Sequence, residues 1–142
     1  MKDKIAENAR DYFMSGLNCA ESVLRATLEQ VEGADKEMFK MATPFGGGVG
    51  GSKQELCGAL TGGVMAIGYL SGRVDPEIDA GPSKAMAAEL RDRFVQSSGS
   101  TRCQALVDGF GPAKQTEQCA LLVAQTAGWV VDLLQDHKLL ND

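Results

Sequence analysis

Four cysteines are the residues of this 142-residue sequence whose side chains could do chemistry together. They are Cys19, Cys57, Cys103 and Cys119. An ionised cysteine attacks disulfides and is a strong metal ligand. In a reducing compartment, cysteines more often carry redox chemistry or bind metal than form structural disulfides. No C-x-x-C pair occurs, which excludes a thioredoxin-type motif and a zinc-ribbon spacing.

A glycine-rich loop shortly before Cys57 is the second feature that suggests a site. Ser52 and Glu55 have the S-x-x-E spacing of a capping box, which predicts a helix start there with Cys57 about one turn inside. The dipole and free N–H groups of a helix start favour a thiolate or a bound anion. Ser52 and Lys53 stand in the wrong order for a phosphate loop. The candidate residues for an anionic ligand or cofactor are Gly46, Gly47, Gly48, Gly50, Gly51 and Ser52.

The other three cysteines also fall near predicted helix starts. The predicted capping residues before Cys19, Cys103 and Cys119 are Asn18, Thr101 and Thr116. Glu21 lies three residues after Asn18, which completes a capping-box spacing. Because helix starts lower the pKa of a thiol, this placement predicts that the four cysteines are held as thiolates.

The elements that must position these cysteines are predicted to be helices throughout. The hydrophobic pattern predicts an all-α fold, a single compact domain over residues 1–142 with six or seven helices. The first segment is either one long helix or two helices that break at residues 15–17, and we favour the break. A central buried helix is expected from Lys53 to about Leu70, directly after the glycine loop.

Four glycines lie inside that expected central helix, at positions 58, 62, 63 and 68. Each costs roughly 0.5–1 kcal/mol relative to alanine. Such a cost indicates that neighbouring helices or a ligand approach the backbone closely.

Charge and hydropathy exclude several classes of protein. The net charge is −5 at pH 7 and no basic stripe occurs, which argues against nucleic-acid binding. The N-terminus lacks the apolar core of a signal peptide. The longest apolar run, residues 64–70, is too short to cross a bilayer. We therefore expect a cytoplasmic protein without membrane insertion.

At this point the chain resembles a known group, the small four-cysteine proteins named for a C-G-A-x-x-G motif and described as redox-active. Residues 57–62, Cys-Gly-Ala-Leu-Thr-Gly, fit that motif. Residues 45–48, Phe-Gly-Gly-Gly, and residues 18–20, Asn-Cys-Ala, are similar to other landmarks of the family. Cys103 and Cys119 fit its third and fourth cysteines. The resemblance implies that the four cysteines act together.

The first functional hypothesis is thiol–disulfide exchange or redox sensing, as in a thiol–disulfide oxidoreductase. Cys57 would be the attacking thiolate and Cys19 the first choice for the resolving thiol. Cys103 and Cys119 would form a second pair, although pairing cannot be deduced from sequence. This chemistry needs no cofactor, and its counterpart would be a redox partner or a small molecule.

Two alternatives remain open. Four thiolates could hold zinc or an iron–sulfur cluster, with Cys19, Cys57, Cys103 and Cys119 as ligands. Alternatively, the glycine loop could bind an anionic ligand or a cofactor phosphate at Ser52. The glycines could equally serve tight helix packing or a homodimer contact.

Overall fold

The computed structural model describes residues 1–141, so Asp142, the last residue of the expected domain, lies outside the described residues. The described part of the chain contains seven helices and no strand, which confirms the all-α prediction. The helices are α1 (Lys2–Met14), α2 (Cys19–Leu28), the 3₁₀ helix η1 (Lys36–Phe45), α3 (Gly58–Ser71), α4 (Gly81–Ser98), α5 (Cys103–Phe110) and α6 (Gln115–Asp136).

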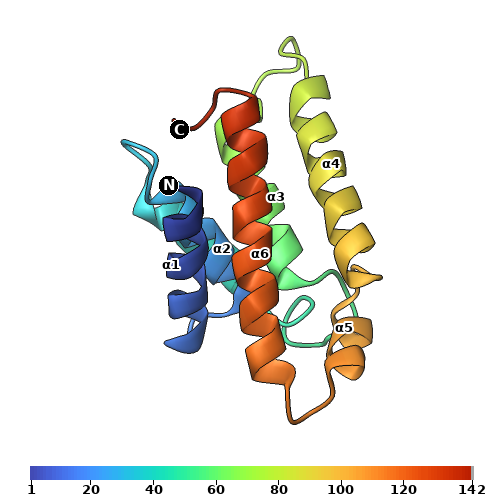
Figure 1. The fold of residues 1–142 in the computed structure, drawn as a ribbon. Coiled ribbons are helices and arrows are strands. Elements are labelled where there is room, and N and C mark those ends of the chain that lie inside the picture. The colour runs from blue at the N-terminus through green and yellow to red at the C-terminus, as the bar shows by residue number, and fades with distance from the viewer. Residues whose placement is uncertain (142) are drawn as a thin grey trace.

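The longest helix, α6, is the centre of the bundle. It contacts α1, α2, α3, α4 and α5, and it runs the length of the molecule in Figure 1. The helix α3, which the sequence predicted to be central and buried, packs on α2, α4, α6 and η1, while Val64, Gly68 and Tyr69 on its remaining side face solvent. The apolar stripe of α6 explains its position, because ten of its residues are buried.

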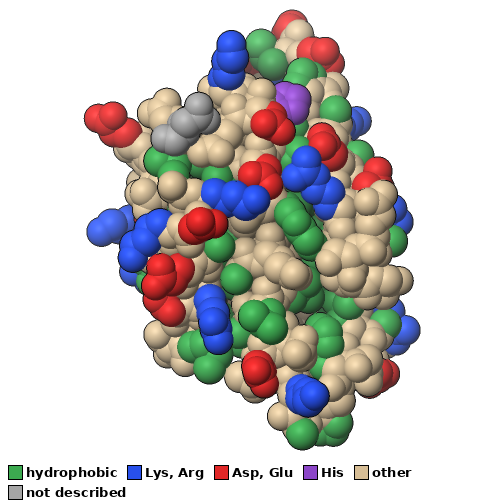
Figure 2. Space-filling view, viewed as in Figure 1, with side chains coloured by type: hydrophobic (Ala, Val, Ile, Leu, Met, Phe, Trp, Pro, Cys, Tyr) green, Lys and Arg blue, Asp and Glu red, His purple; other side chains and the backbone are tan. Residues whose placement is uncertain are grey.

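Packing on α6 follows from the apolar faces of its neighbours. Ile5 and Ala9 of α1 are fully buried, and Phe94 of α4 meets Trp129 of α6 edge to face at 6.4 Å between ring centroids. The outer rim of the α1–α6 contact is polar, with a Lys2–Asp132 ion pair of 2.8 Å. Figure 2 shows positive and negative side chains intermixed on this face of the molecule. No helix within residues 1–141 combines the length and the apolarity needed to cross a membrane.

The predicted break between the first two helices is confirmed. α1 ends at Met14 and α2 begins at Cys19, with Asn18 as the N-cap. The Glu21 N–H donates to the Asn18 side chain at 2.9 Å, and the Asn18 N–H donates to the Glu21 carboxylate at 2.9 Å. This reciprocal pair is the capping box predicted from the spacing of the two residues. It sets Cys19 as the first residue of α2.

The predicted capping box at Ser52 and Glu55 is wrong. α3 begins at Gly58 instead, with Cys57 in the N-cap position. The hydroxyl of Ser52 donates back to the Gly48 carbonyl at 2.8 Å, so it is engaged within the loop. Residues 47–51 and 53 all have positive φ, a left-handed backbone that cannot continue into an α-helix. Cys57 therefore lies at the helix start rather than one turn inside.

The two predicted threonine caps are also wrong. α5 begins at Cys103 after Arg102, and α6 begins at Gln115 after Lys114, with no side-chain cap at either end. Cys103 is still in the first turn, but Cys119 is four residues past the first residue of α6. The start of α5 is set by an interaction that no local pattern shows, an isolated antiparallel bridge between Leu56 and Arg102.

Three of the four glycines in α3 lie where another part of the chain comes very close, as expected. A Cβ on Gly62 would stand 2.5 Å from the Ala20 carbonyl oxygen, and one on Gly63 would stand 2.8 Å from the Val130 side chain. A Cβ on Gly58 would collide with the sulfur of Cys19. Gly68 has nothing within 4 Å of that position, so close packing does not explain it.

Candidate functional site

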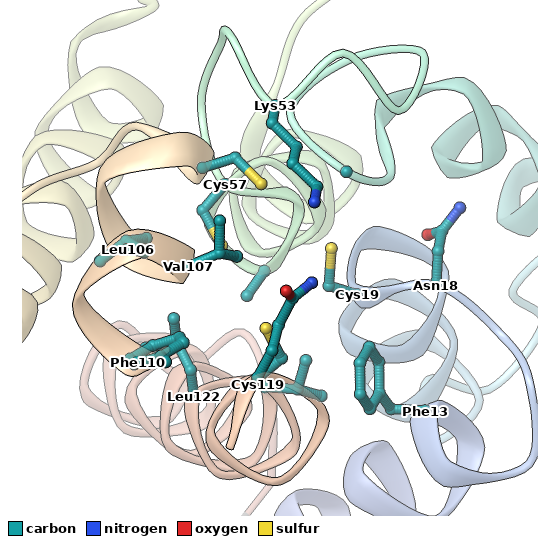
Figure 3. A pocket seen from close by; sticks show the side chains of 15 residues that line it. Phe13, Asn18, Cys19, Lys53, Cys57, Leu106, Val107, Phe110, Cys119 and Leu122 are labelled. Atoms are coloured by element: carbon teal, nitrogen blue, oxygen red, sulfur yellow. The ribbon is translucent and has the colours of Figure 1, made fainter. Parts of the chain in front are cut away.

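All four cysteines line one cavity of about 160 Å³. They belong to four different helices or helix caps: Cys19 begins α2, Cys57 is the N-cap of α3, Cys103 begins α5 and Cys119 lies in α6. Figure 3 shows Cys19, Cys57 and Cys119 around this space. The prediction that the fold brings these widely separated thiols together is confirmed, and all four are free thiols in this structure.

The Leu56–Arg102 bridge places two of the cysteines. The Cys57 N–H donates to the Thr101 carbonyl at 2.7 Å, and the Cys103 N–H donates to the Glu55 carbonyl at 3.0 Å. These bonds join the start of α3 to the start of α5 directly beside the two sulfurs. Cys57 and Cys103 are consequently the most buried of the four, with 7% and 9% of their surface exposed.

The glycine loop wraps the starts of α2 and α5 and contributes to the cavity wall. Gly46 packs against Asn18, and Gly48 packs against Cys103, where an added Cβ would stand 2.7 Å from the Cys103 Cβ. Gly47 itself lines the cavity. Close packing against Asn18 and Cys103 therefore explains Gly46 and Gly48. A Cβ on Gly47, by contrast, would stand 3.0 Å from the Gly51 Cα within the loop itself.

The rest of the loop departs from the anion-site prediction. A Cβ on Gly50 or Gly51 would have no neighbour within 4 Å, and neither residue lines the cysteine cavity. Ser52 does not begin a helix, because α3 starts six residues later at Gly58. The helix dipole that the anion site needed is thus absent from Ser52.

Cys19 is the thiol that the fold ionises. Its pKa is lowered to about 6, chiefly by the hydrogen bond from the Cys57 side chain. Backbone N–H groups of Gly47, Ala20 and Cys19 itself add to this effect and outweigh the cost of burial. Two of these N–H groups belong to the first turn of α2, where free N–H groups stabilise negative charge. At neutral pH Cys19 is therefore a thiolate.

Cys57, which the sequence suggested as the attacking thiolate, has the opposite shift, and this favours Cys19 as the ionised thiol of the pair. Its pKa is raised well above the ordinary value because it donates to Cys19, because it is buried and because the Cys19 charge repels a second one. The backbone N–H groups of Ala59 and Leu60 at the start of α3 favour its ionised form but do not prevail. Helix-start position alone therefore did not decide which thiol ionises.

The remaining two thiols are also protonated. Burial raises the pKa of Cys103, and burial raises the pKa of Cys119 to about 11. The negative charge of Cys19 raises both further, while Lys53 opposes the shift. The expectation of four thiolates does not agree with these shifts, because burial raises the pKa of Cys103 and Cys119 and the Cys19 charge adds to that effect.

The cavity has features that sequence reasoning did not identify. Its walls are largely apolar, formed by Phe13, Leu106, Val107, Phe110, Leu122 and Val123. Lys53 also lines it, and in Figure 3 its amino group points into the cavity. The sequence contained one signal for Lys53, its place at the end of the glycine loop. The apolar residues carry no signal that separates them from core positions.

The arrangement differs from that of a metal centre. Within residues 1–141, no three His, Cys, Asp or Glu side chains are grouped so that they could hold a metal ion. The cysteines share a cavity but, in this conformation, do not form such a ligand set.

Removing the Asn18 side chain is expected to destabilise the protein by about 1 kcal/mol, because Asn18→Ala loses the cap of α2. The Asn18 side-chain N–H also donates to the Thr43 carbonyl at 2.9 Å, which ties η1 to this start. Urea unfolding of the variant measures the loss. Asn18→Ser, which keeps a capping oxygen, is the matched control and should lose less. Equal stability of all three proteins would show that the cap contributes nothing.

Comparison with known proteins agrees with this geometry. A family model with the description "Putative redox-active protein (C_GCAxxG_C_C)" matches residues 17–133, a range that contains all four cysteines. The GCAxxG motif in this description begins Gly-Cys-Ala, whereas residues 57–59 of this chain are Cys-Gly-Ala. No curated protein and no solved structure matches the chain. Because the family match covers most of the chain, the protein is a member of the C_GCAxxG_C_C family of redox-active proteins.

Proposed function

We propose that the protein performs thiol–disulfide exchange, with Cys19 as the attacking thiolate and Cys57 as the resolving thiol. The observation that carries this proposal is the hydrogen-bonded pair of Cys19, ionised, and Cys57, protonated, at one end of a shared cavity. A thiolate of low pKa next to a second thiol is the arrangement that disulfide exchange requires.

The reaction begins when the Cys19 sulfur attacks one sulfur of a substrate disulfide. A bond forms between Cys19 and that sulfur, and the other half of the substrate leaves as a thiolate that takes a proton. Cys57 then loses its proton and attacks Cys19, which releases the second half of the substrate. The substrate is reduced to two thiols, and the protein is oxidised to a Cys19–Cys57 disulfide.

The first step prepares the second. The pKa of Cys57 is raised chiefly by its hydrogen bond to Cys19, next by burial, and then by the Cys19 charge. Once Cys19 is in a mixed disulfide, its charge is gone and its sulfur is a poor hydrogen-bond acceptor. The N–H groups of Ala59 and Leu60 at the start of α3 remain to stabilise the Cys57 thiolate. The pKa of Cys57 should therefore fall once Cys19 has reacted, which makes Cys57 a better nucleophile for the second step.

The test uses 4,4′-dithiodipyridine, a small disulfide whose released thiol is measured by absorbance. The reduced wild-type protein should release two thiols in a fast phase, one from each step, and mass spectrometry should find a Cys19–Cys57 disulfide. Cys57→Ser should release one thiol in that phase and keep the reagent on Cys19. Initial modification of Cys103 or Cys119 would contradict the assignment.

The wild-type protein also tests the alternative hypothesis that the cysteines bind a metal. Zinc and iron analysis after anaerobic purification, together with the thiol count, distinguishes the two functions. Stoichiometric metal that masks Cys19 until a chelator is added would replace the exchange proposal with a metal-binding one.

A further inference from the structure

Resting on the proposed function, we infer that the substrate is a small disulfide with apolar substituents, each no larger than about a benzene ring. The inference names the class of molecule that the cavity around Cys19 and Cys57 admits. It depends on the size, lining and single cation of that cavity.

Size sets the upper limit on the substituent. The cavity holds about 160 Å³, close to the volume of engineered apolar cavities that bind one benzene molecule. One substituent of a small disulfide fills this space while its sulfur meets Cys19. A tripeptide substituent or a folded protein segment exceeds the volume and has to leave most of its bulk outside.

Lining sets the polarity of the substituent. Phe13 of α1, Leu106 and Val107 of α5, and Leu122 and Val123 of α6 form the wall opposite the backbone of the loop. Val107 and Leu122 are 8% and 6% exposed, so they line the cavity without being open to bulk water. An apolar substituent gains by leaving water here. A hydroxyl placed against these side chains loses its hydrogen bonds to water without replacement.

The positive charge of Lys53 can compensate the negative charge that the reaction produces in this apolar cavity. The reaction produces a thiolate from the leaving half of the substrate, and a thiolate in an apolar space needs a compensating charge. Lys53 lines the cavity, its amino group points into it, and its charge opposes the rise in the pKa of Cys103 and Cys119. It is therefore available within the cavity to pair with the departing sulfur. A permanently anionic substrate, by contrast, meets the Cys19 thiolate at the point of attack and is repelled.

The experiment compares two disulfides of nearly the same shape, dipropyl disulfide and bis(2-hydroxyethyl) disulfide. They differ only by a methyl group in place of a hydroxyl at each end. The rate of wild-type oxidation by each is divided by the rate of the same disulfide with a small dithiol in water, which removes their intrinsic difference in reactivity. The corrected rates should favour dipropyl disulfide by at least about tenfold. Oxidised glutathione and insulin should react more slowly than either.

The variant Val107→Thr adds a hydroxyl to the wall at nearly constant volume and should reduce the preference severalfold. Val31→Thr, outside the cavity, is the matched control and should keep the wild-type preference. If Val107→Thr does not fold, the wild-type comparison alone decides. The inference is overturned if the corrected rate with dipropyl disulfide is no higher than that with bis(2-hydroxyethyl) disulfide, or if insulin oxidises the protein faster than either. In that case, rapid reaction with 4,4′-dithiodipyridine would still support the proposed function. Loss of that reaction as well means that the proposed function itself has failed.

Discussion

Replacing Cys19 by serine is expected to slow the alkylation of the native protein by iodoacetamide at pH 7 by about 10- to 100-fold. A thiol whose pKa is about 6 is mostly ionised at this pH. A thiol with the pKa of about 11 that burial imposes on Cys119 is almost wholly protonated. The lower intrinsic nucleophilicity of a low-pKa thiolate offsets part of this difference in ionisation. Mass spectrometry of the wild-type protein should place the first label on Cys19.

The pH dependence of alkylation in the wild-type protein tests the same ionisation of Cys19, with the urea-unfolded protein as the reference. Since Cys19 ionises as pH rises through its pKa, the rate should be half-maximal at about pH 6 and level off above about pH 7. In urea, where the fold no longer acts on Cys19, the midpoint should return to about 8.5, the ordinary value for cysteine. A native rate that keeps rising through pH 8 would show that the fold does not ionise Cys19.

Gly62→Ala is expected to destabilise the protein strongly, because the added Cβ meets backbone atoms of a neighbouring helix. Its Cβ would stand 2.5 Å from the Ala20 carbonyl oxygen and 3.0 Å from the Ala20 Cα, both backbone atoms of α2. These atoms cannot rotate away, so α2 has to shift relative to α3, at a cost of about 1–3 kcal/mol or more. Because Cys19 precedes Ala20, the same shift should weaken its contact with Cys57. Urea unfolding and the pH midpoint of alkylation measure the two effects.

Gly68→Ala provides the matched control in the same helix. Nothing lies within 4 Å of its Cβ position, and alanine is favoured over glycine inside a helix. This variant should therefore gain about 0.5–1 kcal/mol of stability and keep the wild-type alkylation midpoint. If Gly62→Ala were as stable as Gly68→Ala, the close approach of α2 to α3 would not be limiting.

Local patterns were sufficient for some of these features. The Asn18 and Glu21 spacing predicted the capping box that starts α2, because both partners lie within one helical turn of each other. The glycines of α3 indicated a close neighbour, since a helix interior otherwise favours other residues. The sequence did not show which neighbour approaches each glycine. The structure shows that the backbone of α2 approaches Gly62 and that the sulfur of Cys19 approaches Gly58.

Other patterns failed because a longer-range interaction competed with them. Ser52 and Glu55 had the spacing of a cap, but the left-handed turns of the glycine loop kept the chain out of a helix until Gly58. The start of α5 depended on the pairing of Arg102 with Leu56, 46 residues earlier in the chain. No local propensity encodes such a partner.

The helical fold, the start of α2 at Cys19 and the grouping of the four cysteines could be predicted from the sequence, because they follow from periodicity, a local cap and a family motif. Which cysteine is ionised could not be predicted in this way. The pKa of each thiol depends on donors and charges from other elements, and the decisive donor to Cys19 is Cys57, which approaches it from the start of α3. The four thiols, three of them at helix starts and Cys119 within α6, thus differ in ionisation because the fold surrounds each with different donors, charges and burial.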